Sequence, residues 1–492
     1  MMSVRLSSVT CLIGNFCRHL RGLVVGAITL LSIQGCDGPP LQPWHTEQLN
    51  AEFTAEKADD IHSFADYRRL EDELFRQLEE AVYAPTATGP EYALVRYSTG
   101  SAADPQQRQP NWNRSFELEA DAPAGGVLLL HGMSDSPYSL RAMAEAFKQR
   151  GYQALGLRLP GHGTAPLGLT RVSWQDMAAA VRLGMRHLNA AVGDKPIHIV
   201  GYSTGAPLAL DFALDALQGD TSPAPASLIL ISPAIGISPA AALATWKRRL
   251  SIMPGLGGLA WLQVQPEFDP YKYNSFATNA GEQVHRLTRA VARRIATRNG
   301  AASSTMLPPI LILKSTVDAT VSTDAVVERL LRNLAPNRHA LVLFDINRYA
   351  MKSSLLVSDP GPLTARVMDD ATLPFAVTLV TNENPGSAAV KALHKTPFSA
   401  EVSNSEPLNL DWPRGVISLS HVALPFPPDD PLYGQRPASN SDALFLGEMA
   451  IQGERGLLKI PADWLLRLRY NPFYDYLERR TLDWVDGAST SD

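Results

Sequence analysis

Cysteine is nearly absent from this chain of 492 residues. The three cysteines present, Cys11, Cys17 and Cys36, all lie near the amino terminus. Beyond Cys36 the chain therefore has neither a disulfide framework nor a thiolate metal site, and packing alone must stabilise its fold. A stripe of basic residues is also lacking, and the formal net charge is −5, so nothing indicates binding to nucleic acid.

Acidic residues are absent from the first 35 positions, where three arginines accompany an apolar run at 22–33. The run is shorter than the roughly 20 residues that a transmembrane helix needs, which is typical of an export signal. It ends in Ile33-Gln34-Gly35-Cys36, which resembles the bacterial lipobox. The resemblance implies acylation of Cys36 and a membrane-anchored lipoprotein on the periplasmic side of the cell envelope. An uncleaved anchor and a plain secretory signal are the alternatives.

Hydrophobic residues make up 45% of the chain and charged residues 19%, which predicts a packed globular body. Short apolar stretches alternate with helical segments between residues 121 and 346. Strands that are apolar on both faces and separated by helices indicate an α/β fold with a doubly wound, mostly parallel sheet. The expected strands are at 127–130, 152–157, 197–200, 228–231, 310–313 and 340–344, and the expected helices at 139–150, 174–188 and 206–217.

Other segments precede and interrupt this alternation. Residues 59–82 carry apolar side chains at helical spacing, which predicts an amphipathic helix after a Pro-rich tether. Two β-like stretches follow at 92–98 and 114–120. An aromatic-rich segment at 237–307 reads as a cap over the core, and a second insertion at 347–414 contains one more apolar strand, at 375–380.

One motif stands between an apolar strand and a helix: Gly201-Tyr202-Ser203-Thr204-Gly205. In that context the pattern predicts a nucleophile elbow, a sharp turn that holds the serine at strained backbone angles. The positions two residues away must be nearly free of side chains, which explains both glycines. Ser203 is therefore the candidate nucleophile.

A second turn, His131-Gly132-Met133, ends the apolar strand at 126–130. In an elbow-type hydrolase such a turn supplies one backbone N–H to the tetrahedral oxyanion, and the residue after the nucleophile supplies the other. These donors are Met133 and Thr204. We interpret His131 as a structural residue that holds the turn.

These two motifs, together with Arg158-Leu159-Pro160-Gly161-His162-Gly163, resemble the α/β-hydrolase superfamily, and within it the bacterial carboxylesterases and monoacylglycerol lipases/lysophospholipases. The resemblance covers residues 126–345. It implies a serine hydrolase whose catalytic triad runs Ser, acid, His along the chain. It also implies a structural role for His162, in a loop beside the active site.

The acid of such a triad follows the strand after the cap. The strand at 309–313 leads through a short loop to Asp318, which we take as the acid that orients the histidine. Asp345, after the next strand, is the rival.

The family's histidine normally follows the last core strand within a few residues, and here that stretch has none. His339 precedes the strand and belongs to the wrong end of the sheet, while His394 lies inside the second insertion. His421 follows a short predicted strand at 416–420 and opens a Pro-rich loop. We therefore expect His421 to be the general base, reached after an insertion that adds strands.

The predicted organisation is an α/β-hydrolase with a cap insertion and an extra insertion before the catalytic histidine. Its parts are a signal peptide (1–35), a tether (36–58), a helical and β lead-in (59–120), the first part of the core (121–236), the cap (237–307), the second part of the core (308–346), the insertion (347–414), and the histidine loop with C-terminal helices (415–492).

The resemblance implies two-step cleavage of carboxylic esters, with no metal or organic cofactor. An apolar cap and a membrane anchor favour lipid-like substrates such as a lysophospholipid, a monoacylglycerol or a medium-chain ester. Packing of the cap onto the core explains its apolar side chains equally well; they are Trp246, Leu256, Leu259, Trp261, Phe268 and Phe276. The alternatives are a thioesterase or peptidase with the same triad, and a non-catalytic envelope protein that binds a partner.

Overall fold

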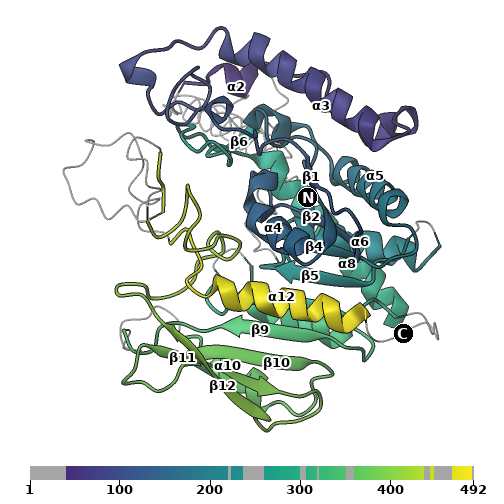
Figure 1. Ribbon diagram of the computed structural model, residues 1–492, viewed down its shortest axis with the longest axis vertical. Coiled ribbons are helices and arrows are strands. Elements are labelled where there is room, and N and C mark those ends of the chain that lie inside the picture. Colours follow the sequence, from purple (N-terminus) through teal and green to yellow (C-terminus); the bar gives the residue numbers. More distant parts are fainter. Residues whose placement is uncertain are drawn as a thin grey trace, which may run out of the picture. The chain divides into compact units, whose positions relative to one another are not determined.

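A ten-stranded mixed sheet organises the chain (Figure 1). The computed structural model describes residues 40–219, 223–236, 260–299, 306–318, 321–350, 359–436, 444–447 and 468–489. The strand order is β1-β3-β2-β4-β5-β8-β9-β10-β11-β12. The strands are β1 (Phe116–Leu118), β2 (Gly125–Leu130), β3 (Tyr152–Leu157), β4 (Ile197–Tyr202), β5 (Ser227–Ile231), β8 (Ile310–Ser315), β9 (Ala340–Phe344), β10 (Ala376–Asn382), β11 (Ala389–Lys395) and β12 (Asn404–Asp411).

The centre of this sheet is parallel, from β3 through β2, β4, β5, β8 and β9 to β10. Antiparallel strands complete both edges: β1 pairs with β3, and β11 pairs with β10 and β12. The sequence-based prediction of a doubly wound, mostly parallel sheet is therefore confirmed. Two further short strands, β6 (Trp261–Gln263) and β7 (Phe276–Ala277), pair with each other.

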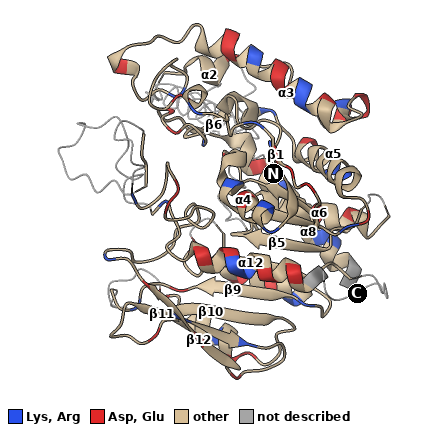
Figure 2. Ribbon diagram, viewed as in Figure 1, with Lys and Arg blue, Asp and Glu red and all other residues tan. Residues whose placement is uncertain are grey.

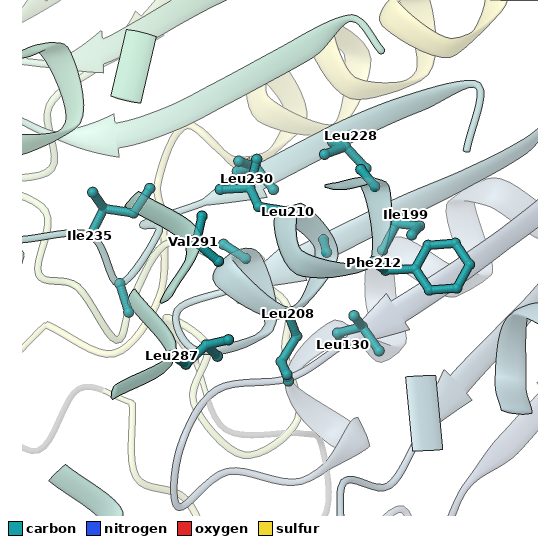
Figure 3. Packing of buried hydrophobic residues seen from close by; sticks show 14 of the residues in the cluster. Leu130, Ile199, Leu208, Leu210, Phe212, Leu228, Leu230, Ile235, Leu287 and Val291 are labelled. Atoms are coloured by element: carbon teal, nitrogen blue, oxygen red, sulfur yellow. The ribbon is translucent and has the colours of Figure 1, made fainter. Parts of the chain in front are cut away.

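Helices cover the two faces of the sheet, because the central strands are apolar on both. α5 (Trp174–Val192), α6 (Gly205–Ala216) and α8 (Thr278–Asn299) contribute to one buried cluster. Figure 3 shows side chains of β2, β4 and β5 in contact range of α6 and α8. α4 (Arg141–Gln149) and α12 (Tyr474–Ser489) contribute to the other cluster. Lysine, arginine, aspartate and glutamate residues lie mainly on the helices and loops, while the central strands contain few of them (Figure 2).

The lead-in packs closely against this core. α3 (Phe64–Leu78) is preceded by Ser63, whose hydroxyl caps the helix by accepting from the Asp66 amide. This helix confirms the amphipathic helix expected in this segment. Behind it the Arg158 guanidinium, 1% exposed, pairs with Glu71 at 3.0 Å and Glu52 at 2.9 Å. A buried cation is tolerated only with such partners, so these pairs join the lead-in to the loop after β3.

The predicted tether is wrong for most of its length. α2 (Pro43–Thr46) is a short helix, and Trp44 and Phe53 are buried in the body of the protein. Trp44 stacks on Tyr97 with ring centroids 5.0 Å apart. Polar composition suggested a free linker, but these aromatic side chains bury enough apolar surface to anchor the segment.

Two predicted strands are also wrong. Residues 92–98 form turns after a short 3-10 helix, Pro90–Tyr92, and residues 416–420 are extended without pairing into the sheet. In the second case side chains and turns bond to the backbone in place of a neighbouring strand: Asn347 donates to the carbonyls of Ile417 and Val416. The strand predicted at 375–380 is β10, and the same insertion supplies β11 and β12, whose positions the sequence analysis did not give.

No helix among the described residues is long and apolar enough to cross a membrane. Cys36 and the predicted signal segment lie outside the described residues, as do Trp246, Leu256 and Leu259 of the predicted cap.

Candidate active site

Ser203 sits at the turn between β4 and α6 with a backbone φ of +51°. This left-handed conformation is uncommon for a residue with a side chain and carries strain. Neighbouring glycines make the turn possible. A Cβ on Gly201 would lie 2.6 Å from the Gly205 carbonyl, and one on Gly205 would overlap the Leu130 carbonyl of β2. The sequence-based prediction of a strained turn flanked by side-chain-free positions is confirmed.

His421 lies between Ser203 and Asp318. Its Nε2 is 3.0 Å from the Ser203 Oγ, and its Nδ1 is 2.8 Å from the Asp318 Oδ2. A carboxylate only accepts, so Nδ1 carries the proton and Nε2 is left to accept from the serine hydroxyl. The structure therefore brings together the three side chains that the sequence indicated as a triad. They come from the ends of β4 and β8 and from a loop after β12.

Two hydrogen bonds hold the His421 loop at the carboxyl ends of the core strands. Ser315, the last residue of β8, donates its hydroxyl to the Leu419 carbonyl at 3.0 Å. Tyr202, the last residue of β4, donates its hydroxyl to the His421 carbonyl at 3.4 Å. The insertion of β10, β11 and β12 therefore lengthens the chain without displacing the histidine.

The rival residues serve other partners. Arg348 holds the Asp345 carboxylate through two N–H donors at 3.0 Å, and the Thr381 hydroxyl adds a third bond. His394 of β11 contacts Thr378 and Glu406. His339 accepts from the Ile310 amide at the amino end of β8, the opposite end of the sheet from Ser203.

The environment of Asp318 contains a buried cation. Lys314, fully buried at the end of β8, lies 3.0 Å from the same Oδ2 that receives His421. Burial alone would raise the pKa of Asp318, but the hydrogen bond and charge of His421, together with Lys314, hold it well below its usual range. The Asp318 Oδ1 accepts from the Val321 amide at 3.0 Å, so both carboxylate oxygens are occupied.

The turn after β2 lies directly beside the serine. A Cβ on Gly132 would lie 3.1 Å from the Ser203 Cβ and 2.8 Å from the Asp135 carboxylate. The next residue, Met133, follows this close approach, and Thr204 lies at the start of α6. Thr204 thus follows Ser203 directly in the chain, and Met133 follows the glycine that approaches Ser203.

His131 and His162 have structural partners, as expected. The His131 ring bonds to the Gly132 carbonyl through Nδ1 at 2.8 Å and accepts from the Leu159 amide at Nε2. Burial lowers the pKa of His131 well below its usual range, and that of His162 to about 4. With both nitrogens committed, His131 is not free to act as a base.

Three buried features beside the site escaped the sequence analysis. Lys314 gave a signal, since a lysine interrupts an otherwise apolar strand. The second feature, the 2.7 Å ion pair between Lys272 and Asp135, joins segments 137 residues apart and left no local trace. The third joins the cap segment to the part of the chain after His421: Asp269 accepts from the Tyr433 hydroxyl and pairs with Arg469 at 3.0 Å.

The described cap residues pack rather than line an open surface. Trp261 is 5% exposed and Phe268 2% exposed, within separate buried clusters, and Phe276 is partly buried. Among the described residues, no group of His, Cys, Asp and Glu has the arrangement of a metal site.

A doubly wound sheet that presents a serine on a strand-to-helix elbow, beside a histidine and an aspartate, defines an α/β-hydrolase. Residues 127–347 match the model of the Alpha/beta hydrolase family. The chain therefore has the α/β-hydrolase fold.

Individual relatives are similar over part of their length. A thermostable monoacylglycerol lipase of Bacillus sp. (strain H-257) is 38% identical over 88 residues, 18% of this chain and 34% of that protein. The magnesium-chelatase 30 kDa subunit of Rhodobacter capsulatus is 35% identical over 97 residues, 20% of this chain and 32% of that one. The chain thus spans about a third of the length of these curated relatives. The structure of a monoglyceride lipase from Saccharomyces cerevisiae aligns at 16% identity with a TM-score of 0.37, covering 47% of this chain and 82% of that one.

Proposed function

We propose that this protein is a serine hydrolase that cleaves carboxylic esters through an acyl-enzyme intermediate. The observation that carries the proposal is the 3.0 Å contact between the Ser203 Oγ and the His421 Nε2, at an elbow where the serine is strained. A binding protein has no need to maintain that strain, whereas a nucleophile gains an exposed hydroxyl beside a base.

In the proposed reaction His421 takes the Ser203 proton as the serine attacks the ester carbonyl. The oxyanion accepts hydrogen bonds from the Met133 and Thr204 amides, and Asp318 stabilises the imidazolium. His421 then gives the proton to the departing alcohol. A water molecule, deprotonated by the same histidine, cleaves the acyl-enzyme and releases the acid.

A lipid-like substrate is the second part of the proposal, covering a lysophospholipid, a monoacylglycerol or a medium-chain ester. The named monoacylglycerol lipase relative supports it. So does the proposed acylation of Cys36, which would hold the enzyme on the periplasmic side of the cell envelope, beside such esters. Labelled palmitate should enter the wild type and the Cys17→Ala variant equally but not Cys36→Ala. Equal labelling of all three would contradict the anchor.

The test uses full-length protein in detergent with p-nitrophenyl esters of rising chain length and a fluorophosphonate probe. We expect hydrolysis, labelling of wild type, and loss of both in Ser203→Ala. No labelling of folded wild type would favour the non-catalytic envelope protein. If the fluorophosphonate labels the protein but thioesters or peptides are hydrolysed faster than oxygen esters, the result would favour a thioesterase or a peptidase.

A further inference from the structure

Lys314 is the last but one residue of β8, and its side chain is fully buried. A lysine at such a place is costly unless its charge is compensated. Its Nζ donates to the Val321 carbonyl at 2.6 Å and lies 3.0 Å from the Asp318 Oδ2. Asp318 is the one charged partner found for it in the described part of the chain.

The same carboxylate oxygen also receives the His421 Nδ1–H at 2.8 Å. The ammonium and the imidazole are therefore held a few ångströms apart, on one acceptor. From β4, the Tyr202 ring faces His421 with centroids 5.6 Å apart and adds a neutral titratable group. His421 and Lys314 both lower the pKa of Asp318, and the Val321 amide donates to its Oδ1.

The Lys314 charge has opposite effects on the charged forms of Asp318 and His421. A cation beside Asp318 stabilises the carboxylate, so the acid stays ionised and continues to orient the imidazole. The same cation repels a proton on the His421 ring, because two positive charges would then share one negative charge at short range.

We propose that Lys314 is a positioning residue of this hydrolase, which acts through Asp318 to keep His421 unprotonated and so extends ester hydrolysis to acid pH. The inference rests on the proposed function, since it assigns Lys314 to the triad proposed there. Burial lowers the pKa of Lys314 and the Asp318 carboxylate opposes that change, which is consistent with a paired cation at this place.

The test compares pH profiles of kcat/KM for full-length wild type, Lys314→Met and Lys314→Gln in detergent, with active sites counted by a fluorophosphonate. Methionine removes the charge and retains most of the volume, while glutamine retains an N–H donor for Val321. We expect the acid limb of both neutral variants to move to higher pH by about one unit. A Lys314→Arg variant keeps the charge, and its limb should stay with the wild type.

Lys395→Met is the matched control. Lys395 is also buried, and its Nζ donates to the carbonyls of Val367 and Asp370, but it belongs to the insertion. Its loss should reduce stability and leave the acid limb unmoved.

Neutral variants that lose rate equally at every pH, with an unmoved limb, would overturn the proposal and leave Lys314 a structural residue. Active-site counting keeps the comparison valid if a variant folds only in part. A wild type without Ser203-dependent turnover would instead refute the proposed function, so the two failures are distinguishable.

Discussion

Lys272 lies in the cap segment, and its Nζ is 2.7 Å from the Asp135 Oδ1 in a largely buried ion pair. The adjacent Tyr273 amide donates to the Ser134 carbonyl at 2.8 Å. Two bonds thus hold the turn that contains Met133, whose amide we propose as an oxyanion donor. Lys272 and Tyr273 of the cap segment therefore fix the position of the proposed oxyanion turn.

Removing that ion pair should misplace the turn without removing the donor. For Lys272→Met we expect kcat to fall by about 10-fold, less than the roughly 100- to 1,000-fold that follows loss of a donor itself. Steady-state kinetics on the preferred p-nitrophenyl ester is the measurement. Asp486→Asn, which breaks the exposed pair with Arg150, is the control and should leave kcat unchanged. Wild-type kcat in Lys272→Met would disprove the role of the pair.

The histidine assignment predicts matched losses. His421→Ala should lose as much turnover as Ser203→Ala, about 1,000-fold or more, because members of a triad act as a unit. His394→Ala, whose ring contacts Thr378 and Glu406, should keep wild-type turnover. His339→Ala should also keep its chemistry while losing stability, since it leaves the buried Ile310 amide without its acceptor. An inactive His394→Ala variant would reassign the base.

Two glycine substitutions should have opposite effects. In Gly205→Ala the new methyl group would overlap the Leu130 carbonyl, so the elbow and the helix after it must shift, and we expect loss of both folding yield and activity. In Gly281→Ala, within α8, the nearest atom to the new methyl lies 3.9 Å away. Alanine is the better helix former, so this variant should gain about 0.5–1 kcal/mol in the free energy of unfolding. Urea denaturation measures both, and a stable, active Gly205→Ala would contradict the close approach.

Glu267 predicts a dependence of stability on pH. It is fully buried, and burial raises its pKa to about 7, although the Asn274 and Ser275 amides and Arg96 act in the opposite direction. A raised pKa means that the folded state holds the proton while the unfolded chain has released it. The contribution of Glu267 to the free energy of unfolding is therefore complete below about pH 4.5. It declines as the pH rises to about 7, by about 3 kcal/mol in all.

The measurement is urea unfolding of wild type and Glu267→Gln at pH 5 and pH 8. The wild type should lose stability relative to the variant as the pH rises, because glutamine has no proton to release. Glu401→Gln, on an exposed loop, provides a comparison that removes the charge without altering a buried site. A stability difference between wild type and Glu267→Gln that is equal at the two pH values would show that Glu267 is ionised in the folded protein throughout.

Local sequence patterns were enough to predict the elbow, the oxyanion turn and the core strands. Each depends on neighbouring residues: Gly201 and Gly205 must be small because the turn between them is tight, and a buried strand must be apolar along its length. The same locality explains the errors. Residues 92–98 have strand-like composition but find no partner strand, and residues 43–58 have linker-like composition but bury Trp44 and Phe53.

The sequence by itself determined the fold class, the elbow that holds Ser203 and the positions of the core strands along the chain, because hydrophobic periodicity and turn chemistry depend on adjacent residues. It ranked Asp318 above Asp345 and proposed His421, but only the tertiary structure brought these side chains together. Asp345 is held by Arg348, and His421 returns past three inserted strands to contact Ser203, 218 positions away. The Lys314 and Lys272 contacts were likewise decided by packing, since bonds between distant segments exist only once the sheet has brought its strand ends to one edge.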